Sequence, residues 1–158
     1  MTSLAGLLSP DLVLIDPPAS SSAEVIESLA DRLIAGGYAR PSLTAAVLAR
    51  EAEFPTGLEL DPDGPNAAIP HADPEHVIAS AAAIATFADP VAFRRMDDPD
   101  ADVAVRLVVM LALADASSQI PVLRELTGML QNAPLVSGLL AARTPESLIA
   151  ALDGGGPA

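Results

Sequence analysis

The sequence predicts an α/β fold in which a mixed β-sheet is flanked by helices in a single-domain sandwich. The length of 158 residues fits one domain of about 100 to 200 residues. Hydrophobic residues make up 51% of the chain, and its 10 glycines and 15 prolines stay below the level of a low-complexity chain. Strand-like and helix-like apolar runs follow in the order β, α, α, several strands, then α, α, α, which favours a sheet with helices packed on it.

The first third of the chain predicts one strand and two helices. Residues 11–16 are an apolar, partly β-branched run closed by two prolines, which predicts a strand. Ser21 and Glu24 have the spacing of a capping box, and apolar residues at helical spacing predict a helix from there to Gly36. A proline at each end limits a second predicted helix to residues 42–54.

The middle of the chain predicts a long loop and then strands. Residues 55–74 hold five prolines, so we expect a loop with brief extended pieces at 58–60 and 67–69. Three apolar runs then predict strands, at residues 77–87, 91–93 and 103–113. Three consecutive alanines from Ala81 leave the first run open to a helical interpretation.

The last third predicts helices. A helix is expected from Ser117, with one apolar stripe formed by Ile120, Leu123, Leu126 and Leu130. Two further short helices begin at Pro134 and at Thr144-Pro145. We expect the domain to span residues 1–152 and residues 153–158 to form a flexible, glycine-rich tail.

Charge and composition exclude several classes of function. Eight basic residues against 21 acidic ones give a net charge of −13, which would repel nucleic acid and anionic membrane surfaces. The longest uncharged apolar run, residues 77–88, is shorter than the roughly 20 residues of a membrane-spanning helix. The N-terminus has no basic residue ahead of an apolar stretch, so we expect no secretory signal. The absence of cysteine excludes disulfides, thiolate metal sites and a cysteine nucleophile.

Both histidines of the chain, His71 and His76, fall in residues 66–76. Pro70 fixes the backbone ahead of His71, so we expect its imidazole at the end of an extended piece with a ring nitrogen facing solvent. A neutral imidazole that another group orients can accept a phosphoryl group and pass it on. A surface histidine without a role remains open at this point.

A metal site is another interpretation of the same segment, with ligands drawn from His71, Asp73, Glu75 and His76. The two histidines are five residues apart in a loop broken by proline, unlike the helical pair of a zinc protease. We therefore predict no metal. A metal-dependent hydrolase would require a metal bound at both histidines.

Three short motifs together resemble a known family: Arg50-Glu51, then Pro55-Thr56-Gly57, then Ala68-Ile69-Pro70-His71. They resemble the enzyme IIA domains of the bacterial phosphoenolpyruvate-dependent sugar phosphotransferase system, in the fructose-mannitol class. The longer string from Asn66 to Val77 is similar to the galactitol-type subgroup. The similarity in element order extends from about Leu4 to Leu152, so it implies the mannitol-type enzyme IIA fold.

The resemblance implies a cytoplasmic phosphocarrier without a cofactor. It implies that His71 accepts a phosphoryl group from HPr and delivers it to a IIB partner, which in the galactitol type carries it on cysteine. The family arginine falls on Arg50, whose planar fork suits phosphoryl oxygens, and Thr56 and Gly57 fall in the phosphate-site loop. The mannitol type has a second histidine where this chain has Gln119, whose amide can donate a hydrogen bond but carries no charge.

Two alternatives stay open within the resemblance. A stand-alone domain of this type can serve as a regulatory module that signals its phosphorylation state by binding other proteins. His76, rather than Gln119, can assist His71. The sugar or polyol is not readable from this chain, because the membrane component IIC selects it and links the domain to the membrane only indirectly.

Overall fold

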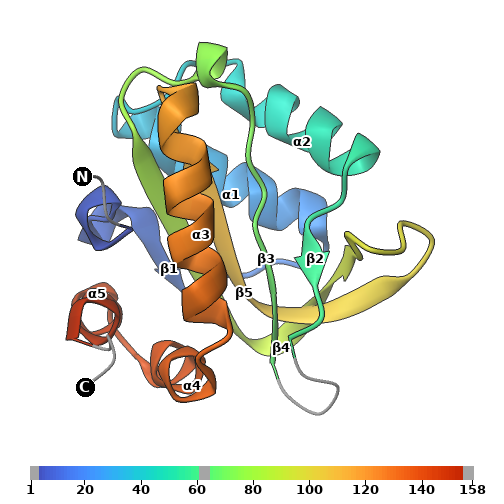
Figure 1. Cartoon of the computed structure of the whole chain (residues 1–158), viewed down its shortest axis with the longest axis vertical. Coiled ribbons are helices and arrows are strands. Elements are labelled where there is room, and N and C mark those ends of the chain that lie inside the picture. The colour runs from blue at the N-terminus through green and yellow to red at the C-terminus, as the bar shows by residue number, and fades with distance from the viewer. Residues whose placement is uncertain (1–3, 61–64, 155–158) are drawn as a thin grey trace.

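A mixed sheet forms the centre of the computed structural model, which describes residues 4–60 and 65–154 (Figure 1). Within these residues it has five strands in the order β1-β4-β5-β3-β2. The strands are β1 Val13–Ile15, β2 Gly57–Leu58, β3 Asn66–Ala68, β4 Ala81–Arg94 and β5 Asp102–Ala112. β1 runs parallel to β4 and β3 parallel to β5, whereas the β4-β5 and β2-β3 pairs are antiparallel.

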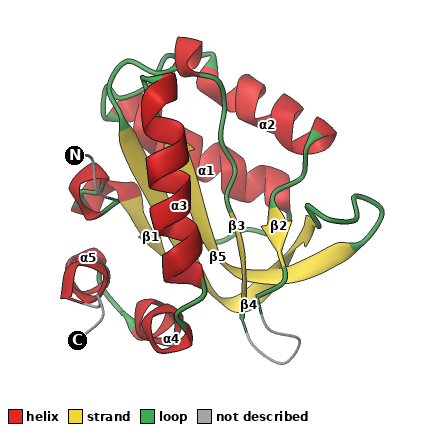
Figure 2. Ribbon diagram, viewed as in Figure 1, coloured by secondary structure: helices red, strands yellow, loops and turns green. Residues whose placement is uncertain are grey.

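Helices cover both faces of this sheet (Figure 2). Helices α1 Ser22–Ala35 and α2 Leu43–Glu53 pack on one face, and α3 Gln119–Leu130, α4 Ala133–Ala141 and α5 Pro145–Gly154 pack on the other. Four short 3₁₀ turns also lie in the described residues: η1 Ala5–Leu7, η2 Pro10–Leu12, η3 Pro74–His76 and η4 Ala116–Ser118. The predicted α/β sandwich with a mixed sheet is confirmed. Within the described residues, no helix is long and apolar enough to span a bilayer.

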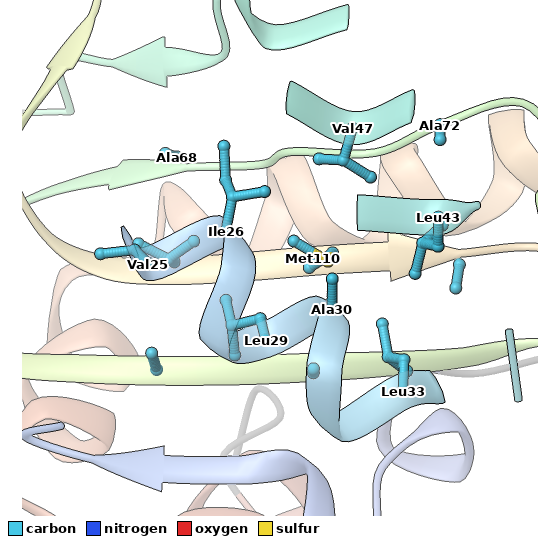
Figure 3. Close-up of a cluster of buried hydrophobic side chains, with 14 of the residues drawn as sticks. Val25, Ile26, Leu29, Ala30, Leu33, Leu43, Val47, Ala68, Ala72 and Met110 are labelled. Atoms are coloured by element: carbon cyan, nitrogen blue, oxygen red, sulfur yellow. The ribbon is translucent and has the colours of Figure 1, made fainter. Parts of the chain in front are cut away.

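The alanine-rich run of β4 is a strand buried on both faces. Ala81, Ala83 and Ala85 face α1 and α2, whereas Ala82 and Ile84 face the α3 layer. Such alternation across a covered central strand produces a continuous apolar sequence, and the small side chains let helices approach closely. Figure 3 shows the α1 side of this core, where α1, α2, β5 and the segment after β3 contribute side chains.

The structure corrects two predicted boundaries. The runs at 77–87 and 91–93 form one strand, β4, because its pairing with β5 continues on both sides of an irregularity between Thr86 and Val91. Residue 77 lies ahead of that strand. Helix α5 continues to Gly154, so the first two residues of the predicted tail are helical. The rest of that tail, residues 155–158, lies outside the described residues.

The predicted apolar stripe of α3 is also partly wrong. Ile120 is 68% exposed, and the buried face is formed by Val122, Leu126, Met129 and Leu130. Val122, Leu126 and Met129 have i, i+4, i+7 spacing, so they define the side that packs on the sheet. Ile120 in the first turn is left at the surface near the end of β5.

Candidate functional site

His71 lies where the chain leaves β3 and continues beside β5. The Leu111 amide donates to the Pro70 carbonyl at 3.1 Å, and His71 forms an isolated parallel bridge with Leu111. The next residue, Ala72, is buried in the α1 and α2 core (Figure 3). Because neighbouring side chains alternate along an extended segment, His71 points toward the opposite face, where α3 begins.

The half-buried His71 ring lines a small surface depression. Its walls are His71, Ala72, Leu111, Leu113, Gln119 and Leu123. The enclosed space is about 10 Å³, which corresponds to roughly one water molecule. The depression is therefore shallow, and it leaves the His71 ring at the surface of the domain.

One nitrogen of the His71 ring is held by the backbone. Nδ1 lies 2.9 Å from the Ile69 carbonyl oxygen, and because a carbonyl only accepts, Nδ1 carries the proton and Nε2 the lone pair. Burial lowers the pKa of His71, the Ile69 hydrogen bond raises it, and the charges of Arg50 and Asp73 respectively lower and raise it. The net lowering favours the neutral, nucleophilic imidazole near pH 7.

Residue Ile69 is itself anchored, by its amide, through Thr56 to helix α2. The Glu51 carboxylate accepts from the Thr56 amide at 2.8 Å and from the Thr56 hydroxyl at 2.7 Å. The Thr56 carbonyl in turn accepts from the Ile69 amide at 3.4 Å. Burial raises the pKa of Glu51, and the two bonds from Thr56 oppose that rise. Glu51 thus connects the end of α2 to the backbone that holds His71.

Thr56 and Gly57, expected in a phosphate-site loop, are buried in the scaffold. Thr56 is 3% exposed and its hydroxyl is bound to Glu51, so that hydroxyl is not offered to a phosphoryl group. A Cβ on Gly57 would lie 2.5 Å from the Arg94 carbonyl oxygen. Glycine is therefore needed here because β2 passes so close to the end of β4.

Arg50 stands in the last turn of α2 with donors available. Its Nη1 lies 3.4 Å from Asp73 Oδ1, and its guanidinium carbon lies 5.7 Å from the centre of the Phe54 ring. Its buried Nε has no hydrogen-bond partner in the part of the chain that the structure describes. A buried donor without an acceptor is uncommon, which is consistent with a site that an anionic group completes.

Gln119 and His76 occupy different positions relative to His71. Gln119, the first residue of α3, lines the same depression as His71, and its side chain makes no hydrogen bond to another described residue. His76 lines a neighbouring depression with Arg50 and Asp73, and its Nδ1 is 2.9 Å from the Ser42 hydroxyl. Across residues 4–60 and 65–154, no three histidines or carboxylates are grouped as metal ligands.

Sequence reasoning missed three contributors to the site. The sequence suggests Asp73 only as a metal ligand, although its place two residues after His71 indicates a charge near the ring. Leu111 and Leu113 form the wall of the depression. They come from the end of β5, about 40 residues away, and only the strand order brings them there.

The fold and site together define a class of protein: a single α/β domain with a half-buried, backbone-held imidazole at a surface depression where two parallel strands end. The family model of the phosphoenolpyruvate-dependent sugar phosphotransferase system, EIIA 2, matches residues 6–154. The galactitol-specific EIIA component of Escherichia coli (strain K12) is 37% identical over 117 residues, which are 74% of this chain and 76% of that protein. The chain therefore belongs to this EIIA family, and the resemblance noted in the sequence is confirmed.

Two solved structures have a similar fold. A putative PTS IIA (PtxA) from Streptococcus mutans has a TM-score of 0.79 at 20% identity, covering 99% of this chain and 97% of that one. A chain from the complex of enzyme IIAMTL and phosphorylated enzyme IIBMTL of Escherichia coli has a TM-score of 0.74 at 22% identity, covering 93% of this chain and 97% of that one. As a member of the EIIA family, the protein is a phosphoryl-transfer component of the phosphotransferase system.

Proposed function

We propose that the protein is the cytoplasmic phosphocarrier of a galactitol-like sugar or polyol system, with His71 accepting a phosphoryl group from HPr and passing it to a IIB partner. The observation that carries the proposal is the Nδ1 contact of His71 with the Ile69 carbonyl, which leaves Nε2 unprotonated beside a surface depression. The identity to a galactitol-specific EIIA component supports the substrate class.

The transfer needs one bond to form and one to break. The Nε2 lone pair of His71 attacks phosphorus, and the phosphorus-nitrogen bond of phosphorylated HPr breaks with its electron pair left on the donor nitrogen. The His71 ring keeps its Nδ1 proton and acquires the positive charge that the donor ring loses. The Ile69 carbonyl stabilises that charge through the existing hydrogen bond. The reverse sequence delivers the group to IIB, whose acceptor we take to be a cysteine thiolate.

Arg50 supplies the charge that the phosphoryl oxygens require. Its buried Nε has no partner among the described residues and its Nη1 is only loosely paired with Asp73, so the guanidinium can turn its fork to two phosphoryl oxygens. Gln119 is the first residue of α3, at the positive end of the helix dipole, and lines the depression on the other side of His71. There its side-chain amide can donate to a third phosphoryl oxygen or orient the His71 ring. Positioning and charge stabilisation are sufficient because the donor bond is already reactive.

The acceptor is a protein with a small exposed reactive group. The depression beside His71 has room for roughly one water molecule, and Ile120, the chain neighbour of the lining residue Gln119, is an exposed apolar side chain of the kind found at protein interfaces. The fold shared with a IIA protein that is solved in complex with phosphorylated IIB supports IIB as the partner. A regulatory module is the second candidate left open by the sequence. It shares the phosphorylation step and differs only in the partner.

Intact-mass measurement after incubation with phosphoenolpyruvate, enzyme I and HPr tests the proposal. The unaltered protein is expected to gain one acid-labile phosphoryl group, His71→Ala none, and His76→Ala nearly the parental amount. Labelling that persists in His71→Ala and disappears in His76→Ala would reverse the assignment. Adding a galactitol-type IIB should then remove the group within the mixing time, and a phosphorylated protein that IIB does not discharge would favour the regulatory role.

A further inference from the structure

A carboxylate lies against the guanidinium that we assign to the phosphoryl group. Asp73 Oδ1 is 3.4 Å from Arg50 Nη1, and the Asp73 side chain is 66% exposed. Both residues line the depression that adjoins the His71 depression at Ala72. The separation is longer than the roughly 2.8 Å of a strong charge-assisted hydrogen bond, so the pair can open at low cost.

The charges of Arg50 and Asp73 both reach the His71 ring. Arg50 favours the neutral imidazole and Asp73 favours the protonated one, as their opposite effects on its pKa indicate. A phosphoryl group on His71 brings negative charge to the same place. Arg50 then attracts the phosphoryl group and Asp73 repels it. The Asp73 carboxylate and the phosphoryl group therefore compete for the same guanidinium.

We propose that Asp73 is a positioning residue that occupies Arg50 while His71 is unmodified and destabilises the phosphorylated form, so that the phosphoryl group leaves readily. The inference deepens the proposed function and rests on it. A carrier must release its group as easily as it takes it, and an arginine free to bind the phosphoryl oxygens at full strength would favour retention. Asp73 sets that balance without touching the transferred group.

The equilibrium of phosphoryl exchange with HPr measures this effect directly. Phosphorylated protein is mixed with an excess of unphosphorylated HPr, and the fraction still phosphorylated is read by intact mass. Asp73→Asn should shift the equilibrium toward the phosphorylated protein by about fivefold, the upper range for an exposed charge pair, and the shift should shrink at high salt. It should also lengthen the lifetime of the isolated phosphorylated protein. Asp73→Glu should restore the parental equilibrium.

Glu75→Gln is the matched control, because it removes one negative charge from an exposed side chain two residues further along the chain, in η3. It should change the equilibrium by less than about twofold. The melting temperature should be the same in all variants, because the Asp73 side chain is exposed. If Asp73 had a structural role, Asp73→Asn would lower the melting temperature.

Equal effects of Asp73→Asn and Glu75→Gln would overturn the inference, as would a shift toward HPr. An unaltered protein that takes no phosphoryl group on His71 would instead overturn the proposed function, and the inference with it. The two failures are therefore distinguished by the first measurement on the unaltered protein.

Discussion

Replacing Glu51 tests whether the anchor behind His71 is needed for stability and for transfer. Glu51→Ala removes the acceptor of two hydrogen bonds from Thr56, a residue that is 3% exposed. A hydrogen bond to a charged group contributes about 1.5–3 kcal/mol. Because burial raises the pKa of Glu51, its carboxylate pays a desolvation cost that alanine avoids, and we expect a net loss of about 2–3 kcal/mol.

For a domain of this size, such a loss lowers the melting temperature by about 5–10 °C. Glu51→Gln keeps one acceptor oxygen and should lose about half as much. Phosphoryl uptake from HPr at a temperature where both variants are folded should slow by about tenfold in Glu51→Ala, because the Ile69 carbonyl that orients His71 loses its support. Glu27→Ala, on the exposed side of α1, is the control. A Glu51→Ala protein with parental melting temperature and parental uptake would refute the reasoning.

Three further predictions concern the site itself. Arg50→Lys keeps the charge but loses the planar fork of the guanidinium, so rapid-quench kinetics should show phosphoryl uptake from HPr slowed by at least about tenfold. Parental kinetics would remove Arg50 from the site. Because the pKa of His71 is lowered, the rate of phosphoryl uptake should be constant from pH 8 to about 6.5 and fall only at lower pH. In that lower range His71 is protonated first in the unfolded chain, so the free energy of unfolding should also decline. A rate that rises on acidification would contradict this prediction. Gln119→Leu should slow transfer to IIB with little change in melting temperature, and Gln119→His should lengthen the lifetime of phosphohistidine near pH 6 but not at pH 8.

The helices that carry local signals could be predicted from the sequence. In α1, the Ser21 hydroxyl accepts from the Glu24 amide at 3.3 Å, which is the cap that the spacing of these residues indicates. The left-handed Gly37, with φ of 83°, follows its C-terminus. These interactions are between residues a few positions apart, so no knowledge of the fold is needed to expect them.

The length of β4 could not be predicted, because it depends on a partner strand. Exposed residues between Thr86 and Val91, among them Asp89 and Pro90, look like the end of a strand in the sequence. The β5 strand pairs with β4 on both sides of this irregularity, which keeps the two halves in one strand. The exposed Ile120 has a similar cause, since which side of α3 faces the sheet is decided by packing.

The motif Arg50-Glu51 illustrates how two neighbouring residues serve the site in different ways. Successive residues on an α-helix point about 100° apart, so one side chain of the pair can reach a surface while the next turns toward the scaffold. Arg50 extends to Asp73, whereas Glu51 binds Thr56, which accepts from the amide of Ile69, the residue whose carbonyl holds the His71 ring. The resemblance seen in the sequence assigned Arg50 to the phosphoryl oxygens and placed Thr56 and Gly57 in the phosphate-site loop, but it gave Glu51 no role. The structure separates the two side chains: Arg50 contacts Asp73 at the surface, and the hydrogen bonds that run from Glu51 through Thr56 to Ile69 support the residue whose carbonyl holds Nδ1 of His71.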